Sequence, residues 1–213
     1  MKVGKYIVIE GADGVGKTTA ANGLAEYLRG TGKTVKLVSE GSVNESGLEF
    51  SDKIGEILHD TSFELENRTE ILLFTAIRTE LWHKVIWPAL EAGTTVISTR
   101  NWLSMIAYQG FGNKFNYQRI LKFNKMVMAP GYIRPDKTFL LVADQEKTRQ
   151  RIIDRASGCL NSDAFETRGD EFRALVNEGY QMILDNPDGD FNVIGIDASK
   201  AKYDVINQIV SHL

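Results

Sequence analysis

The chain has 213 residues, of which 43% are hydrophobic and 25% charged, with a formal net charge of −3 and an isoelectric point near 5.7. This size and composition suit one domain that buries roughly 70% of the surface of its unfolded chain. The weakly acidic balance argues against a protein held on nucleic acid by phosphate neutralisation, because such binding needs clustered Lys and Arg.

Cysteine usage and hydropathy indicate the cellular setting. Cys159 is the only cysteine, so an intramolecular disulfide is impossible, and the three histidines are too scattered for a structural zinc site. The sequence has no apolar run of about 18 residues, and its first residues lead directly into a strand. We therefore expect a cytoplasmic protein that makes no membrane contact.

Short β-branched runs alternate with longer helical stretches, which is the pattern of a parallel sheet covered by helices on both faces. The expected strands are Tyr6–Ile9, Thr34–Val38, Thr94–Ser98, Lys137–Val142 and Phe191–Ile196. Apolar residues recur every three or four positions across Leu65–Ala92, which predicts one long amphipathic helix ending at Gly93. We find no repeat, low-complexity tract or linker, so residues 1–213 should form a single α/β domain with three layers, α/β/α.

A glycine-rich turn follows the first expected strand. Gly11-Ala-Asp-Gly-Val-Gly-Lys-Thr18 matches the pattern G-x-x-x-x-G-K-[ST] and precedes the helical run Thr19–Leu28, which is the context that this motif requires. Its backbone N–H groups can surround phosphate oxygens, Lys17 can reach the terminal phosphates, and the Thr18 hydroxyl can ligate Mg²⁺. We therefore predict a P-loop NTPase fold that binds ATP and Mg²⁺. The candidate nucleotide-binding residues are Gly11, Asp13, Gly14, Val15, Gly16, Lys17, Thr18 and Thr19, with Thr18 as the candidate metal ligand.

A phosphate loop alone does not separate kinases, GTPases and motor ATPases. A GTPase should carry an Asn-Lys-x-Asp element that reads guanine, but the pairs Asn113-Lys114 and Asn124-Lys125 are followed by Phe-Asn and Met-Val. A motor ATPase usually ends a later strand with an acidic residue, whereas the third expected strand is followed by Thr99. A kinase is therefore favoured.

Aromatic, cationic and polar side chains in two later segments predict a second anion site. On the long helix, Phe74 and Arg78 lie one turn apart, so that an aromatic ring is beside a cation. Arg100 follows the third strand, at the edge where parallel sheets bind ligands. The helix after it places Ser104 and Tyr108 on one face.

Taken together, these motifs resemble the thymidylate kinase family. The resemblance covers nearly the whole chain and is carried, in the family's order, by residues 10–19, 70–78, 100–110, 134–139 and 193–199. It implies phosphoryl transfer from ATP to dTMP, or to a related deoxynucleoside monophosphate, in a five-stranded P-loop fold with a lid. It also implies a homodimer.

The same resemblance implies a role for each residue of the acceptor site. Phe74 should stack on the pyrimidine, and Arg78 and Gln109 should hydrogen-bond to its edge. Tyr108 should pack under the sugar and disfavour a 2′-hydroxyl, while Asp13 should hold the 3′-hydroxyl. The candidate substrate residues are Asp13, Phe74, Arg78, Arg100, Ser104, Tyr108 and Gln109, with Arg100 gripping the acceptor phosphate.

Four arginines between residues 149 and 168 surround a polar stretch that resembles the family's lid, at about residues 156–169. In the bacterial type of the family, the lid supplies the cation that neutralises the transferred phosphoryl group. Gly14 and Val15 are neutral here, so the lid should do the same. The candidate catalytic residues are Lys17, Arg100, Arg151 and Arg155. No catalytic base is needed, because the second pKa of a monophosphate is near 6.

Three features depart from the family pattern. Thr99 precedes Arg100 where aspartate is usual, Ala164 replaces a common lid arginine, and Glu40-Gly-Ser-Val43 replaces Glu-Pro-Gly-Gly. These changes would suit a divergent member, such as a viral enzyme. They leave two alternatives open. One is a kinase for a deoxynucleoside, with Glu40 as base, or for another or base-modified monophosphate; the other is a non-catalytic nucleotide-binding or regulatory protein.

Overall fold

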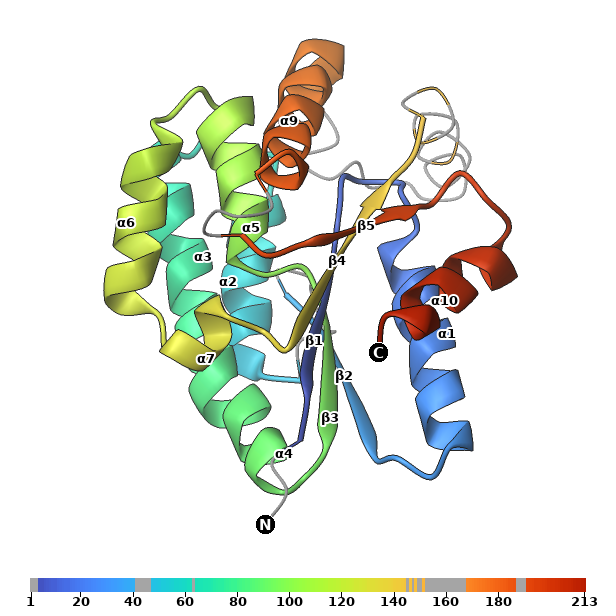
Figure 1. Cartoon of the computed structure of the whole chain (residues 1–213). Helices are drawn as coiled ribbons and strands as arrows, with labels where there is room; N and C mark the ends of the chain where they lie inside the picture. The colour runs from blue at the N-terminus through green and yellow to red at the C-terminus, as the bar shows by residue number, and fades with distance from the viewer. Residues whose placement is uncertain are drawn as a thin grey trace.

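The computed structural model describes residues 4–40, 47–62, 64–144, 146, 148, 151, 168–186 and 191–213. A five-stranded sheet in the order β2-β3-β1-β4-β5 forms the middle layer, and all its strands are parallel (Figure 1). The strands are β1 (Tyr6–Glu10), β2 (Val35–Ser39), β3 (Thr95–Thr99), β4 (Lys137–Val142) and β5 (Ile194–Asp197). This confirms the predicted parallel α/β fold of the P-loop type.

The last strand begins later than expected. It starts at Ile194 rather than at Phe191, because Asn192 has a φ of 42° that a strand cannot accommodate. Phe191 instead packs in the core, with its ring centroid 6.0 Å from that of Trp102.

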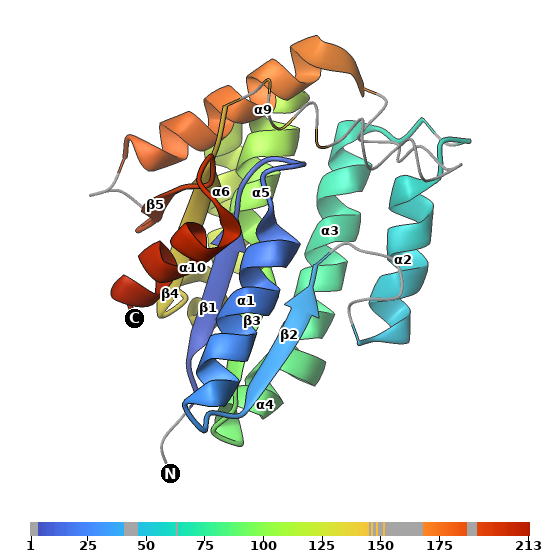
Figure 2. The same cartoon turned by 90° about the vertical axis from the view of Figure 1, so that its right-hand side faces the viewer.

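Helices cover both faces of the sheet (Figures 1 and 2). One face carries α1 (Lys17–Gly30) and α10 (Lys202–Ser211). The other carries α2 (Glu49–His59), α3 (Asn67–Leu81), α4 (Trp87–Glu91), α5 (Trp102–Met105), α6 (Tyr117–Val127), α7 (Pro130–Ile133) and α9 (Gly169–Leu184). Within the described ranges, no helix combines the length and the apolar character needed to cross a bilayer.

Two π-helical turns interrupt the helices of the second face: η1 (Trp82–Ile86) and η2 (Ile106–Gly112). The first lies inside the segment Leu65–Ala92, which the sequence predicts to be one long helix. The helix therefore continues from α3 to α4, with one wider π-helical turn between them. Pro88 explains the widening, since proline lacks an N–H and its ring clashes with the carbonyl of the preceding turn. The second carries Tyr108 and Gln109. π-Turns are frequent at functional sites.

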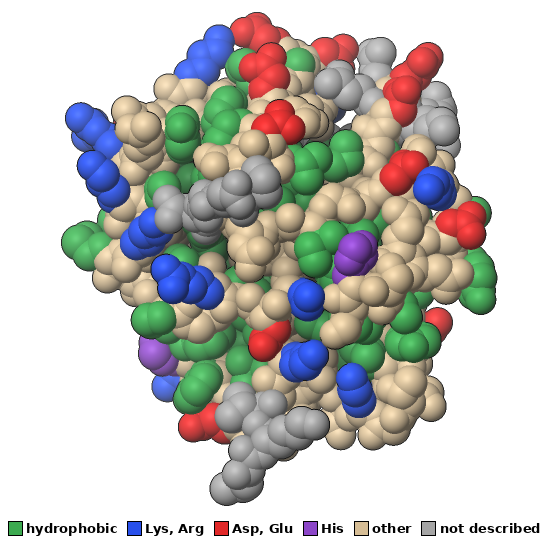
Figure 3. Space-filling model, viewed as in Figure 1, with side chains coloured by type: hydrophobic (Ala, Val, Ile, Leu, Met, Phe, Trp, Pro, Cys, Tyr) green, Lys and Arg blue, Asp and Glu red, His purple; other side chains and the backbone are tan. Residues whose placement is uncertain are grey.

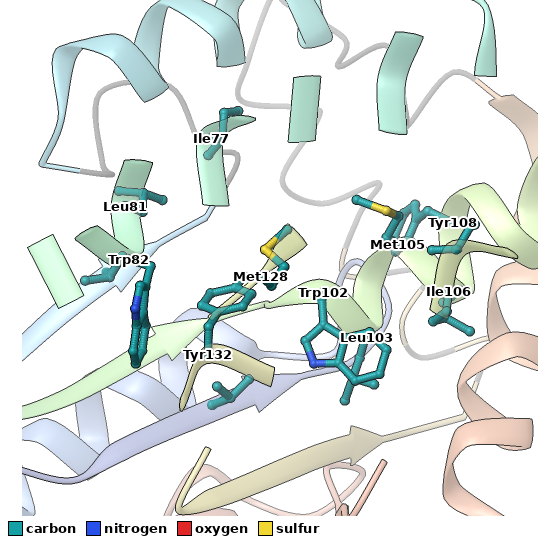
Figure 4. Close-up of a cluster of buried hydrophobic side chains, with 14 of the residues drawn as sticks. Ile77, Leu81, Trp82, Trp102, Leu103, Met105, Ile106, Tyr108, Met128 and Tyr132 are labelled. Atoms are coloured by element: carbon teal, nitrogen blue, oxygen red, sulfur yellow. The ribbon is translucent and has the colours of Figure 1, made fainter. Parts of the chain in front are cut away.

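The strands β1 and β3 are buried along their whole length, with one apolar core on each side of them. In the larger core, Trp82 of η1 meets Tyr132 of α7 edge to face, with ring centroids 6.0 Å apart, as Figure 4 shows. Tyr108 and Ile106 of η2 belong to the same cluster. Because α3 and η2 are both anchored in this core, their polar side chains are held in fixed positions at the carboxyl end of the sheet.

Candidate active site

The turn between β1 and α1 has the conformation of a phosphate loop. Gly11, Gly14 and Gly16 have φ values of 141°, 74° and 104°, which L side chains rarely adopt. A Cβ on Gly11 would also come within 2.6 Å of the carbonyl oxygen of Leu141. Helix α1 begins without a capping side chain and without an acidic residue in its first turn. Its first amides therefore offer an anion site, which fits the phosphates of ATP.

Lys17 folds back over this loop. Its Nζ donates hydrogen bonds to the carbonyl oxygens of Gly11 (2.9 Å) and Ala12 (2.8 Å), and it lies 3.8 Å from Oδ1 of Asp13. Thr18 and Thr19 are exposed in the first turn of α1. An exposed hydroxyl at this position fits a ligand of Mg²⁺ that is bound mainly through phosphate oxygens.

Arg100 occupies a strained backbone position at the end of β3. Its φ is 74°, in the left-handed region that is uncommon for a residue with a side chain. The surrounding hydrogen bonds maintain it: the N–H of Arg100 donates to the carbonyl of Ile9 (2.9 Å), and the hydroxyl of Ser98 donates to the carbonyl of Arg100 (3.0 Å). Strain of this kind occurs mainly at functional sites.

The guanidinium of Arg100 gathers the residues predicted to surround the acceptor phosphate and sugar. Nη1 donates to the hydroxyl of Ser104 (3.1 Å), and Nη2 donates to the hydroxyl of Tyr108 (3.0 Å). Nη2 also forms an ion pair with Asp13, whose other oxygen accepts from Tyr108 at 2.7 Å. The structure thus brings Asp13, Arg100, Ser104 and Tyr108 together beside the phosphate loop.

Sequence reasoning missed two members of this cluster, Glu10 and Tyr180. The buried carboxylate of Glu10 accepts hydrogen bonds from the backbone N–H of Asn101 (2.7 Å), the hydroxyl of Ser104 (2.8 Å) and the hydroxyl of Tyr180 (2.9 Å). Burial raises the pKa of Tyr180 well above its usual value near 10, so its hydroxyl remains protonated and donates. Glu10 thereby ties the end of β1, the segment after Arg100 and α9 to one another.

Phe74 and Arg78 of α3 lie together, as their spacing predicted, with Cζ of Arg78 5.1 Å from the centre of the Phe74 ring. Nε of Arg78 donates to Oε2 of Glu40 at 3.1 Å, and both residues are buried. The hydroxyl of Tyr132 donates to the same oxygen at 2.6 Å. Nη1 of Arg78 is also buried, and it finds no hydrogen-bond partner among the described residues.

The burial of Glu40 has a consequence for stability. Burial raises its pKa from 4.5 to about 7, although Arg78 and Tyr132 act to lower it. Between these two pKa values Glu40 binds a proton in the folded protein but not in the unfolded chain. The contribution of Glu40 to stability therefore increases as the pH falls. Relative to Glu40→Gln, the free energy of unfolding of the wild type should rise as the pH falls from 7.5 to 5.5, by at most about 2 kcal/mol. Urea unfolding of both proteins across this range measures the difference, and a difference that stays constant or shrinks contradicts the shift.

Gln109 is buried next to Tyr108, and its Nε2 donates to Oε2 of Glu70 on α3 at 3.1 Å. Because Glu70, Phe74 and Arg78 follow one another at intervals of four on α3, the residues predicted to read the base share one side of that helix. Gln109 approaches this side from η2.

Of the two candidate lid arginines, Arg151 lies at the phosphate loop. Its Nη1 is 3.3 Å from the carbonyl oxygen of Val15, and its Nη2 is 3.5 Å from that of Ala198. Arg155 and most of the expected lid, including Ala164, lie outside the described residues. Arg168, at the end of the lid range, forms an ion pair with Glu70.

Thr99 is buried at the end of β3, where its hydroxyl donates to that of Ser39 at 3.1 Å. A neutral contact between strands thus takes the place of the family's aspartate. Within the described part of the chain, no group of three His, Cys, Asp or Glu side chains is arranged to hold a metal ion. The candidate metal ligand, Thr18, has the exposure that Mg²⁺ bound to a nucleotide requires.

Comparisons with known proteins point to one family. A family model described as thymidylate kinase matches residues 9–209. Proteins named thymidylate kinase from Chlorobaculum parvum and Rhodopirellula baltica are 34% and 33% identical to the chain over 212 and 208 residues. These alignments cover 97% and 98% of the chain and 94% and 79% of the relatives. The protein of that name from Exiguobacterium sibiricum is 33% identical over 181 residues, which is 84% of the chain and 81% of the relative.

Proposed function

The chain belongs to the thymidylate kinase family, and we propose on that basis that it transfers the γ-phosphoryl group of ATP to dTMP. One observation carries the proposal: Nη1 of Arg100 lies 3.5 Å from the carbonyl oxygen of Gly11. A cation suited to the acceptor phosphate is therefore beside the turn suited to the donor phosphates. Bringing two anions together in line is the main task of phosphoryl transfer.

We assign the donor site to the phosphate loop, residues 11–19. The amides at the start of α1 would bind the β- and γ-phosphates, and Lys17 would exchange its bonds to Gly11 and Ala12 for bonds to phosphate oxygens. Mg²⁺ bound with ATP would add positive charge against the phosphates, with Thr18 as its protein ligand.

For the acceptor, we assign Arg100 to the monophosphate and Asp13 to the sugar 3′-hydroxyl. Tyr108 would lie under the sugar, because its hydroxyl already bonds both Asp13 and Arg100. Ser104 would keep the guanidinium of Arg100 in place. At the far end of the nucleotide, Phe74, Arg78 and Gln109 would contact the base.

Catalysis requires charge neutralisation rather than a base. The acceptor oxygen of a monophosphate is already ionised at neutral pH, so positive groups must draw the two phosphates together. We assign this role to Lys17, Arg100 and Arg151, which all contact the phosphate loop, and to Arg155. Closure of the lid would exclude water while the phosphoryl group moves.

We further propose that the chain acts as one domain, as a homodimer, and in the cytoplasm. Its partners would be small nucleotides and not nucleic acid. On the face shown in Figure 3, basic and acidic side chains both occur, with apolar and neutral polar side chains between them. A face with such mixed charges does not suit the phosphate backbone of a nucleic acid.

A panel of monophosphates tests the proposed activity. With Mg-ATP as donor, kcat/KM for ADP formation should be highest with dTMP. The value for dCMP, dAMP or dGMP should be lower by at least about tenfold. An assay that couples ADP formation to NADH oxidation measures these rates. A preference for another monophosphate would redefine the substrate, and turnover of thymidine but not dTMP would establish a nucleoside kinase.

The structure gives the rival activities no support. A nucleoside kinase would need Glu40 as a base facing the 5′-hydroxyl, yet Glu40 is only 3% exposed and its carboxylate is bound by Arg78 and Tyr132. For a non-catalytic protein, ATP and dTMP would raise the melting temperature without any release of ADP.

A further inference from the structure

A polar cluster lies beside the proposed base site, with Glu70 and Gln109 buried at its centre and Asn113 and Arg168 half-buried around them. We call it the Glu70 cluster. Oε2 of Glu70 accepts hydrogen bonds from Nε2 of Gln109 (3.1 Å) and Nδ2 of Asn113 (3.0 Å), and its other oxygen pairs with Nη2 of Arg168. Glu70 and Gln109 are each 2% exposed. Their contacts therefore form away from bulk water, where a wrongly oriented polar group is costly.

The charge of Glu70 determines which end of the Gln109 amide faces it. A carboxylate only accepts hydrogen bonds, whereas an amide side chain has a donor end and an acceptor end. If Gln109 turned its oxygen toward Glu70, two acceptors would meet in a buried place. Its NH₂ group therefore faces the carboxylate. In this orientation the other end of the amide, Oε1, is the end that could accept a hydrogen bond from a bound base.

On the same side of α3, Nη1 of Arg78 is a buried donor without a partner among the described residues. In the proposed base site, Gln109 would thus offer an acceptor and Arg78 a donor. A thymine or uracil edge offers the matching pair, an N–H at position 3 and a carbonyl at position 4. Cytosine offers the reverse, an acceptor at position 3 and an amino group at position 4.

We propose that Glu70 is a positioning residue that sets the base specificity of the site by fixing the polarity of the Gln109 amide. The proposal rests on the proposed function, since it concerns how the same site chooses its substrate. Glu70 makes no contact with the base in this scheme. It acts through Gln109.

Arg168 completes the cluster from the lid side. Its Nη1 also donates to Oδ1 of Asn113 at 2.9 Å, and its guanidinium stacks on the ring of Phe172 at 5.1 Å. A buried carboxylate without a cation would be strongly unfavourable, so Arg168 compensates the charge that orients Gln109. The base-reading end of the site is thereby tied to the start of α9, where the expected lid ends.

The substitution Glu70→Gln tests the proposal, because it preserves shape but can present either a donor or an acceptor to Gln109. The Gln109 amide should then turn over easily. We expect the ratio of kcat/KM for dTMP to that for dCMP to fall at least tenfold, mainly through the KM values. The ratio for dTMP to dUMP should not change, since both bases present the same edge. The control Glu80→Gln makes the same chemical change on the same helix and should leave both ratios as in the wild type.

A purely structural role for Glu70 would lower activity with every monophosphate alike and leave both ratios unchanged, which would overturn the proposal. If wild-type protein does not turn over dTMP, the proposed function fails and the specificity scheme fails with it. If the wild type does turn over dTMP and E70Q keeps the same preference for dTMP over dCMP, only the proposed role of Glu70 is refuted.

The exchange variant E70Q/Q109E provides the second arm of the test. It returns a carboxylate to the pair, now at position 109, so that an acceptor again faces the base. Preference for dTMP over dCMP should recover by at least tenfold relative to E70Q. Should E70Q fail to fold, the exchange variant decides alone, and loss of the preference in that variant rejects the proposal. Binding of dTMP and dCMP by calorimetry gives the same comparison without turnover.

Discussion

Replacing Lys17 with methionine is expected to lower kcat for dTMP phosphorylation by about 10²- to 10³-fold. Methionine has a similar length but carries no charge. It would lose both the interaction with the transferred phosphoryl group and the hydrogen bonds to the carbonyls of Gly11 and Ala12. Because positive charge here acts on the transition state more than on the bound substrates, the KM for dTMP should change little.

The matched control is Lys33→Met, the same replacement at an exposed position between α1 and β2. Its turnover should equal that of the wild type. Melting curves of both variants establish that they are folded. Equal turnover in Lys17→Met and the wild type would show that the phosphate loop does not serve the reaction.

Several parts of this site could be predicted because their signals are local. The phosphate loop is one continuous motif between a strand and a helix. Ser104 and Tyr108 could be placed together because they lie four apart in a helical segment, and both do contact Arg100. The parallel order of strands places the end of β3 beside the end of β1, which is why Arg100 could be predicted to face the loop.

The parts that could not be predicted depend on packing between distant segments. The hydroxyl of Tyr180 reaches Glu10 across 170 residues of chain, and the hydroxyl of Tyr132 reaches Glu40 across 92. Neither tyrosine lies in a recognisable motif, so only the docking of α9 and α7 reveals its role. The ion pair of Arg78 similarly depends on how β2 and α3 pack, because helical spacing alone would pair it with a neighbour on α3.

One departure from the family pattern, Thr99, acquires a physical meaning in the same way. Thr99 bonds across to Ser39, so its position supports the sheet edge rather than a metal ion. Glu40, which the chain shares with the family pattern, follows β2 and is enclosed by Arg78 and Tyr132, so it is not free to act as a base. The other departures, at residues 41–43 and at Ala164, lie outside the described residues.

Replacing Arg100 with alanine should reduce kcat/KM for dTMP by about 10²- to 10³-fold, since the acceptor phosphate would lose its cation. The KM for ATP should change far less, because the amides and Lys17 of the donor site remain. Initial rates at varied dTMP and ATP concentrations separate the two effects. Arg119→Ala, at an exposed position on α6, is the control and should behave as the wild type.

The backbone of Arg100 allows its side chain to be separated from its conformation. At a φ of 74°, alanine retains the strain of a left-handed residue, whereas glycine does not. Arg100→Gly should therefore be as inactive as Arg100→Ala but more stable to urea, by about 1 kcal/mol. If the less stable variant also loses more activity, the loss of activity is caused by a change in the folded structure. If both lose activity equally, the loss of the guanidinium is responsible and the backbone strain is not.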